Sequence, residues 1–499
     1  MKCCTLWIWL SLVSAGPLAA AAPNILFIAV DDLRPEFGAY GADTVKSPNL
    51  DRLARSGMTF RRAYCQQAVC SPSRTSLMTG VRPDTSKVWD LQTHFRAALP
   101  EVTTLGQHFK NHGYFVQGMG KLYHGGFDDA PTWSVPWQAA KGAAYGRAEN
   151  RDASDVASTA AGKPAGRPAK GKRAQAGGPR SRGPAFEAAD VPDETFTDGK
   201  VAALAVRTLG QLSAQPKPFF LAVGFAKPHL PFVAPQKYWD LYDPAQIKLA
   251  ANPFRAKAAP DYAVLEGGEL RNYRGIPDGP LSEGLARQLK HGYYASISYM
   301  DAQLGRVLDE LDRLGLASRT IVVLWGDHGW KLGEHGAWCK HSNTENDTNA
   351  PLLVSVPGMK HVGSTCDGLV EFVDIYPTLA DLAGLPRPGH LEGTSFRPLL
   401  ENPLRAGKSA AFSQYPRSLG DGRQLMGYSM RTARHRFTAW VPRAEPHAIE
   451  AVELYDHAVD PQENVNIAAR PENAALVEQL TAQWRLGWKG ARPADDPAK

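Results

Sequence analysis

The stretch from Cys70 to Gly80 combines three features that together suit an anionic group. Its sequence is Cys-Ser-Pro-Ser-Arg-Thr-Ser-Leu-Met-Thr-Gly. Ser71 is a favourable N-cap, Pro72 suits the first position of a helix, and Gly80 suits the position after its end. The cysteine would then lie just before a helix N-terminus, where free amides and the helix dipole favour an anion by about 0.3–1 kcal/mol. Arg74, one turn further on, can direct its guanidinium to the same point. The alternative is a small buried cysteine beside a surface helix.

Two further pairs of residues suggest a metal ion. Asp31 and Asp32 directly follow one apolar run, and Asp327 and His328 follow another. Carboxylates that lie close together repel one another unless a cation joins them. Ligation dominated by oxygen favours Ca²⁺ or Mg²⁺, and Zn²⁺ is the second choice because one histidine among carboxylates suits it less well. The alternative for either pair is a turn after a strand.

The runs before these residues predict a parallel sheet. A continuous apolar run suits a strand that is buried on both faces. Four such runs occur, at Ile25–Val30, Tyr114–Val116, Phe219–Val223 and Ile321–Trp325. The second leads to Lys121 and His124, and the third leads to Lys227 and His229. Because ligands of open α/β sheets bind at the carboxyl ends of the strands, we expect all these polar groups along one sheet edge.

The remaining periodicities predict two domains. Apolar residues at steps of three and four from Leu289 to Leu311 predict a helix that ends at Gly315. A strand at Pro351–Val356 and a helix at Ile375–Leu382 complete an α/β domain over residues 23–387. Residues 388–499 predict a smaller α+β subdomain. Its expected strands are Tyr428–Thr432, Phe437–Val441 and Glu453–Asp456, followed by a helix from Pro471.

The chain of 499 residues carries a net charge of +6, which one segment explains. Residues 139–189 are rich in Ala, Gly, Pro, Lys and Arg, and ten basic against three acidic residues lie between Lys141 and Ala185. We expect a mobile, solvated insertion there, since it has too few large apolar residues to offset its ordering entropy. The rest of the chain is close to neutral, so no nucleic-acid partner is expected.

The N-terminus predicts export. Residues 1–22 contain Lys2, an apolar run and four small residues, as in a secretory signal. That run is too short to span a bilayer, and no later segment is long and apolar enough, so no membrane span is expected. The mature chain would keep Cys65, Cys70, Cys339 and Cys366. It is therefore no disulfide scaffold. We expect a periplasmic or secreted protein, or a lysosomal one in a eukaryote.

The string Cys70-x-Pro72-x-Arg74, followed by Leu-Met-Thr-Gly, resembles the signature of the type I sulfatases. In that family the cysteine is oxidised after translation to formylglycine, an aldehyde. Gly120-Lys121-Leu122-Tyr123-His124 resembles the second signature of the same family. The resemblance implies a fold like that of alkaline phosphatase, with a large, mostly parallel sheet flanked by helices.

The resemblance also implies roles for individual residues. One Ca²⁺ per chain would be held by Asp31, Asp32, Asp327 and His328 together with residue 70. Arg74 would stabilise the anionic hydrate of the aldehyde, and Asp327 is a candidate base. His124 would take a proton as sulfate leaves. Lys121, Lys340 and His229 would neutralise the sulfuryl oxygens, and His229 or Lys340 would protonate the departing sugar oxygen. A formylglycine-generating enzyme would be needed for maturation.

Within the family, several strings are similar to the iduronate-2-sulfatase subfamily. They include Arg82-Pro83-Asp84-Thr85, Trp338-Cys339-Lys340 and Phe372-Val373-Asp374-Ile375-Tyr376-Pro377. His341 stands where that subfamily has a tyrosine. The expected activity is therefore hydrolysis of a sulfate ester on a sulfated carbohydrate, a 2-O-sulfated uronate or a related sugar, in glycosaminoglycan degradation. The alternatives are a hydrolase of phosphate esters or phosphonates and a non-catalytic protein that binds sulfated glycans.

Overall fold

The structure is a computed structural model that describes residues 22–151, 182–266 and 268–494. Residues 1–21 of the expected secretory signal and residues 152–181 of the basic segment lie outside the described residues. Among the helices that are described, none combines the length and the apolar character that crossing a membrane requires.

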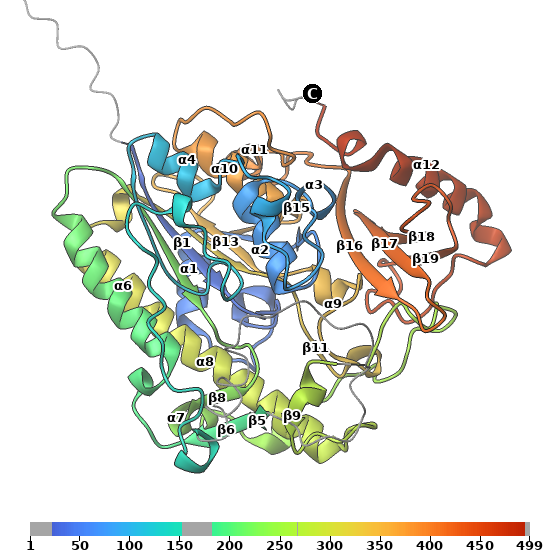
Figure 1. Cartoon of the computed structure of the whole chain (residues 1–499), viewed down its shortest axis with the longest axis horizontal. Coiled ribbons are helices and arrows are strands. Elements are labelled where there is room, and N and C mark those ends of the chain that lie inside the picture. Colours follow the sequence, from blue (N-terminus) through green and yellow to red (C-terminus); the bar gives the residue numbers. More distant parts are fainter. Residues whose placement is uncertain (1–21, 152–181, 267, 495–499) are drawn as a thin grey trace, which may run out of the picture.

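A seven-stranded sheet forms the centre of the larger domain in the described part of the chain (Figure 1). Its strands, in spatial order, are β14 (Ser364–Cys366), β2 (Met58–Phe60), β13 (Leu352–Ser355), β10 (Thr320–Gly326), β1 (Asn24–Val30), β7 (Phe219–Phe225) and β4 (Phe115–Gly120). β1 pairs in parallel with β10 and β7, and β7 pairs in parallel with β4. β13 runs antiparallel to β10 and to β2. The expected mostly parallel sheet is confirmed, and each predicted apolar run overlaps one of its strands.

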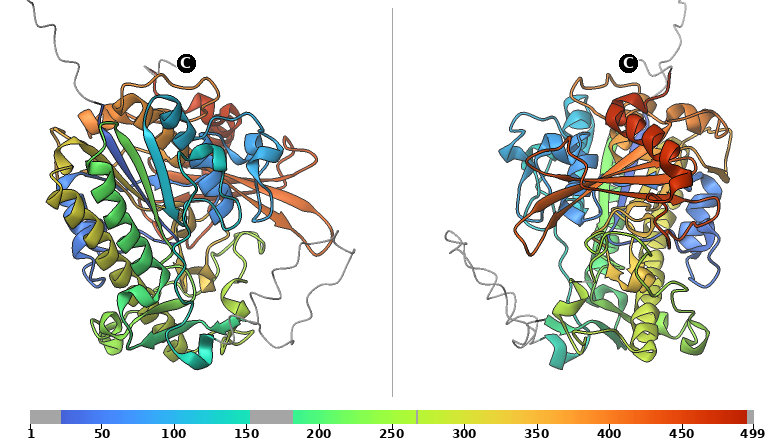
Figure 2. Two further views of the ribbon diagram at one scale, coloured as in Figure 1. Left: turned by 60° about the vertical axis from the view of Figure 1, so that its left-hand side comes forward. Right: turned by 90° about the vertical axis from the view of Figure 1, so that its right-hand side faces the viewer.

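Helices cover both faces of this sheet, because successive side chains of β1 point to opposite faces and all of them are buried. Leu26, Ile28 and Val30 point into one core, and Ile25 and Phe27 point into the other. The first core is completed by α1 (Pro48–Ser56), α6 (Thr197–Ser213) and α8 (Glu283–Arg313), the last two of which lie side by side in Figure 2. The second is completed by α2 (Cys70–Thr79), α4 (Leu105–Asn111) and α10 (Ile375–Leu382). The predicted helices at 289–311 and 375–382 are therefore confirmed.

Short elements connect these layers. They are α3 (Pro83–Ser86), α7 (Gln236–Trp239), α9 (Glu345–Thr348), α11 (Arg397–Glu401), β3 (Ala63–Tyr64), β11 (Lys331–Leu332), β12 (Trp338–Cys339) and β15 (Val370–Glu371).

The start of α2 differs from the prediction. Cys70 is the first residue of the helix, and Val69, which has no side-chain acceptor, takes the N-cap position that Ser71 was expected to hold. All ten residues of α2 are buried, so tertiary packing rather than a capping hydroxyl determines where the helix begins. The end is as predicted, since Gly80 adopts a left-handed φ of 71°.

The C-terminal subdomain is an antiparallel sheet with a helix packed against it. The strands are β16 (Ala410–Ser418), β17 (Gln424–Thr432), β18 (His435–Pro442) and β19 (Ala451–Asp456), and the helix is α12 (Ala474–Gly490). The sequence did not predict β16, because its polar residues and Pro416 interrupt the apolar alternation. β16 is the strand that joins this sheet to the larger domain: the Gln414 amide donates to the Gln66 carbonyl at 2.7 Å, and Ser413 Oγ donates to the Cys65 carbonyl at 2.6 Å.

The two described ends of the basic segment are packed rather than mobile, which corrects the expectation for that part of residues 139–189. β5 (Arg182–Pro184) pairs with β9 (Tyr273–Arg274), and β6 (Phe186–Ala189) pairs with β8 (Phe232–Pro235). Tyr145 is 3% exposed, and its hydroxyl donates to the Pro184 carbonyl at 2.9 Å. A few aromatic side chains therefore anchor a segment whose average composition predicts no core.

Candidate active site

The first turn of α2 places Cys70 at the carboxyl edge of the central sheet. Its side chain is 2% exposed. The Sγ atom lies 3.5 Å from Asp31 Oδ1 and 3.5 Å from His328 Nε2, with Lys340 Nζ at 3.7 Å and Lys121 Nζ at 4.0 Å. Burial, and then the charge of Asp31, raise the pKa of the Cys70 thiol well above its usual range. An unmodified cysteine here is therefore a neutral thiol and a poor nucleophile.

Buried carboxylates from two neighbouring strands converge beside this thiol. Asp31 and Asp32 follow β1, Asp327 follows β10, and all three are fully buried. Ligand atoms of Asp32, Cys70, Asp327 and His328 lie within 4.8 Å of one another, and the same holds for Asp31, Asp32, Cys70 and His229. Three carboxylates with one or two nitrogen donors form a donor set dominated by oxygen, which fits Ca²⁺ better than Zn²⁺.

Arg74 connects two of these carboxylates. Its Nε donates to Asp327 Oδ2 at 3.0 Å, and its Nη2 donates to Asp31 Oδ1 at 2.9 Å. Its Nη1 donates to the carbonyls of Lys121 and Leu122 at 2.6 and 3.1 Å. The side chain is 0% exposed, and the two carboxylates outweigh burial and raise the pKa of its guanidinium. Arg74 is therefore a fixed cation that orients the acidic cluster.

Two lysines bind the remaining carboxylate oxygens. Lys121 forms an ion pair with Asp31, and Lys340 Nζ lies 2.8 Å from Asp32 Oδ1. Burial raises the pKa of the Asp31 carboxyl, but Lys121, His229, Arg74 and Lys340 together outweigh it and hold that pKa well below its usual range. The pKa of the Lys340 ammonium is raised well above its ordinary value, because Asp32 and other anionic neighbours outweigh its burial. Both lysines are therefore permanent positive charges beside residue 70.

The backbone around Lys340 has an unusual conformation. Cys339 and His341, on either side of it, have φ values of 73° and 90°, in the left-handed region that non-glycine residues rarely adopt. Strain of this kind persists only where the surrounding structure imposes it, and it is concentrated at functional sites. Here it turns Lys340 toward Asp32 and Cys70.

Two histidines near residue 70, His124 and His229, have opposite protonation tendencies. Burial, and then Lys121, lower the pKa of His124 to about 4, and its buried Nδ1 has no hydrogen-bond partner in the described part of the chain. For His229, burial lowers the pKa, but Asp32, Asp31 and Glu269 outweigh it, so that its pKa is raised. His124 is therefore neutral near pH 7, and His229 favours the protonated form.

Glu269 is a residue of this cavity that the sequence did not predict. Its Oε1 lies 3.1 Å from His229 Nε2, and its Oε2 lies 3.1 Å from Lys340 Nζ. No apolar run precedes Glu269, so its sequence context gave no signal. Lys227, which follows the same strand as His229, donates to the carbonyls of His229 and Pro231 and shapes the turn.

The cluster opens into a cavity of about 930 Å³. Its lining comes from the β4 and β7 ends, from the basic segment and from β16. The basic residues that line it are Lys121, His124, Lys141, Arg182, His229, Lys340, His341 and Arg417, and the acidic ones are Asp128, Glu266 and Glu269. Positive side chains therefore outnumber negative ones, and a concave space of this size fits an anionic ligand larger than sulfate itself.

Comparison with known proteins identifies the family. The sulfatase family profile matches residues 23–385, which is more than half of the chain. The chain belongs to the sulfatase family. This sulfatase is accordingly a sulfuric ester hydrolase, and a second profile, described as N-sulphoglucosamine sulphohydrolase, C-terminal, matches residues 333–486.

A curated relative and two solved structures are also similar to this chain. The sulfatase is 34% identical over 541 residues to iduronate 2-sulfatase of Mus musculus, with 93% of this chain and 94% of the relative covered. A structure solved with its substrate D-glucosamine-2-N,6-O-disulfate matches with a TM-score of 0.72 at 20% identity and covers 95% of this chain and 99% of its own. A phosphonate monoester hydrolase from Silicibacter pomeroyi matches with a TM-score of 0.71 at 21% identity, covering 95% and 96%. The two structures support the fold, and the mouse relative supports the family.

Proposed function

We propose that this sulfatase releases sulfate from an acidic sulfated carbohydrate, a 2-O-sulfated uronate or a related sugar, with formylglycine at position 70 and one Ca²⁺. The observation that carries the proposal is the cavity whose floor is residue 70 and whose lining is cationic. The similarity to a relative named iduronate 2-sulfatase over 93% of the chain supports the sugar class.

The donor set supports the two cofactors. Asp31, Asp32, Asp327 and His328, with residue 70, would hold Ca²⁺, which supplies charge neutralisation for sulfate oxygens when it is bound. Formylglycine, when hydrated, supplies an oxygen nucleophile for sulfur and a second hydroxyl that allows the sulfate to be released. The thiol of an unmodified Cys70 has neither property, and its raised pKa keeps it protonated.

The charge of each remaining side chain determines its role in orienting groups, neutralising charge or transferring a proton. Arg74 fixes the orientation of Asp31 and Asp327. Lys121 and Lys340 stay positive and neutralise the sulfate oxygens. The protonated His229 can donate its Nε2 proton to the departing sugar oxygen, a role that Lys340 fills less well because its ammonium is held so firmly. The neutral His124 can accept a proton as sulfate leaves.

The entrance of the cavity suits the carboxylate of a uronate. Arg182 lines it, with its guanidinium over the Tyr273 ring at 5.3 Å and its Nη1 donating to the Tyr273 hydroxyl at 3.3 Å. Lys141 also lines the cavity and is exposed. At the position of the subfamily tyrosine, His341 has its pKa lowered to about 3, first by burial and then by Lys340, so its imidazole is neutral. It can bind a sugar hydroxyl but adds no charge.

The direct test is sulfate release from a panel of defined oligosaccharides, measured by ion chromatography. We expect terminal 2-O-sulfated uronates to be preferred over 6-O-sulfated glucosamine units. Arg182→Ala should raise KM for the uronate substrate about tenfold, the loss expected for a hydrogen bond to a charged group. The same variant should leave KM for an aryl sulfate unchanged. Faster turnover of an aryl phosphate or phosphonate than of every sulfated sugar would instead favour the phosphoester alternative.

We also propose that the chain is exported and matured by a formylglycine-generating enzyme. The support is the composition of residues 1–22 and the string around Cys70. N-terminal sequencing of the exported protein should begin near Pro23. Retention of an intact N-terminus on active enzyme would contradict export by cleavage.

A further inference from the structure

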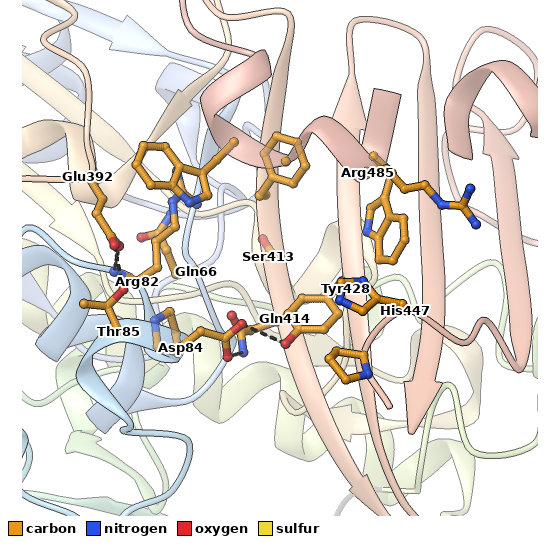
Figure 3. A pocket seen from close by; sticks show the side chains of 16 residues that line it. Gln66, Arg82, Asp84, Thr85, Glu392, Ser413, Gln414, Tyr428, His447 and Arg485 are labelled. Atoms are coloured by element: carbon orange, nitrogen blue, oxygen red, sulfur yellow. Dashed lines mark hydrogen bonds between the residues drawn. The ribbon is translucent and has the colours of Figure 1, made fainter. Parts of the chain in front are cut away.

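A second cavity of about 430 Å³ lies outside the active site, between the two domains (Figure 3). Figure 3 shows Arg82, Asp84 and Thr85 of the larger domain, together with Glu392, on one side, and Tyr428, His447 and Arg485 of the C-terminal subdomain on the other. None of these residues belongs to the catalytic cluster described above.

Aromatic rings make up much of the lining. Phe412, Tyr428, Trp484 and Trp488 all face this space. The ring of Trp484 packs at a tilt of 52° against Tyr428, with centroids 6.4 Å apart. Gly487, with a φ of 62° and a ψ of −167°, breaks α12, and beyond this break the Trp488 ring lies within 5.0 Å of the Arg82 guanidinium. The subdomain therefore presents large, partly exposed apolar surfaces to the cavity.

Two carboxylates, those of Asp84 and Glu392, line the polar side of the cavity, and uncharged groups donate hydrogen bonds to both. Asp84 accepts from Tyr428 Oη at 2.7 Å, from Gln414 Nε2 at 2.9 Å and from Trp89 Nε1 at 3.1 Å. Glu392 accepts from the Arg82 amide and from Thr85 Oγ1, both at 2.6 Å. Carboxylates that are fixed in this way keep free lone pairs and suit hydroxyl donors.

Two arginines also belong to the lining. Arg82 is 7% exposed, and its guanidinium binds Glu371 through both terminal nitrogens, yet its buried Nε has no hydrogen-bond partner in the described structure. Arg485 is exposed at the rim. Figure 3 shows the Arg485 guanidinium directed away from Asp84 and Glu392, so a ligand with hydroxyl groups would use the two carboxylates.

β16 links this cavity to the active site. Its residues Phe412, Ser413 and Gln414 line the second cavity, and the next residues, Tyr415 to Ser418, line the catalytic one. At about 3.4 Å per residue, positions 413 and 417 are separated by about 14 Å along the strand. An extended oligosaccharide is long enough to span that distance.

We propose that the second cavity is a carbohydrate subsite that binds a pyranose unit of the same polymer, remote from the unit that loses its sulfate. The apolar face of the sugar packs on the aromatic rings, and its hydroxyls donate to Asp84 and Glu392. The proposal rests on the proposed function in taking the ligand to be carbohydrate. It makes the enzyme sensitive to chain length, which the catalytic cavity alone would not do.

The test compares heparin-derived disaccharide and hexasaccharide as probes. Binding is measured by calorimetry with the full chain carrying Cys70→Ala, and KM is measured with the active enzyme. Two variants remove different parts of the subsite: Trp484→Ala removes a ring, and Asp84→Asn keeps the shape but removes a charge. Leu486→Ala, on the same helix and 68% exposed outside the cavity lining, is the control.

We expect the hexasaccharide to bind more tightly than the disaccharide, and each variant to weaken hexasaccharide binding about tenfold, as for a lost hydrogen bond to a charged group. Disaccharide binding and KM should not change, and Leu486→Ala should behave as the parent. Equal affinity for the two probes, or hexasaccharide affinity that neither variant alters, would overturn the subsite. If the variants lose hexasaccharide binding but the active enzyme releases sulfate from no sugar, the subsite is upheld and the proposed function is refuted.

Discussion

Replacing Arg74 by methionine tests the electrostatic design of the site. The side chain is 0% exposed and donates four hydrogen bonds, two to carboxylates and two to backbone carbonyls. Arg74→Met keeps a long apolar side chain but leaves Asp31 and Asp327 without this cation. Breaking a buried ion pair by removing one partner costs about 3–5 kcal/mol, because the remaining charge is uncompensated. We expect a loss of that size in the free energy of unfolding of the protein in chelator.

The measurement is urea unfolding followed by circular dichroism, with and without saturating Ca²⁺. The matched control is Arg52→Met. Arg52 Nη1 lies 2.6 Å from Asp309 Oδ1, and the two side chains of this ion pair are 36% and 69% exposed. An exposed pair contributes about 0–1 kcal/mol, so the control should lose little. Ca²⁺ should recover part of the loss in Arg74→Met, because it neutralises the same carboxylates, and should not affect the loss in Arg52→Met. A chelator-treated Arg74→Met that is no less stable than Arg52→Met would refute the reasoning.

Three further predictions concern Lys340, the proposed metal ligand Asp327 and two histidines. Lys340→Met should lower kcat about 100-fold or more, the usual loss when one group that stabilises a transition-state charge is removed. The control is Lys237→Met, which removes a largely exposed lysine. Equal activity of the two variants would contradict the role of Lys340 in neutralising the sulfate oxygens. Ca²⁺ should raise the thermal unfolding midpoint of protein from which a chelator has removed metal, and Asp327→Asn should make that increase smaller. An increase of the same size in Asp327→Asn would show that Asp327 is not a metal ligand. Burial, the largest cause, holds the pKa values of His108 and His124 at about 4, below the ordinary 6.5. Unfolding therefore takes up protons between these values, and the free energy of unfolding should fall as pH drops from about 6.5 to 4; His108→Gln should flatten that slope, and an identical slope would contradict the lowered pKa.

The sequence predicts the central sheet well because burial on both faces leaves a clear signal. β1, β7 and β10 are continuous apolar runs, and each ends where polar residues begin. The direction of a strand leaves no such mark, so the antiparallel orientation of β13 was not predicted. β16 escaped prediction for a different reason, since its residues serve the interface and two cavities rather than one core.

The residues of the site divide in the same way. Cys70 and Arg74 share one helical turn, and a local string is enough to suggest them as partners. Glu269 contacts His229 and Lys340 only through the tertiary fold, and nothing in its neighbourhood along the chain distinguishes it from a surface acid. The conformation that turns Lys340 inward depends on left-handed φ values at Cys339 and His341, two residue types that do not predict them.

The state of residue 70 tests the central claim most directly. Several preparations of the enzyme, matured to different extents, are digested, and the peptide that contains residue 70 is quantified by mass spectrometry as thiol or aldehyde. Specific activity in sulfate release is measured on the same preparations. The account predicts that activity rises in proportion to the aldehyde fraction and vanishes when that fraction is zero. Full activity in a preparation whose residue 70 is entirely thiol would contradict it.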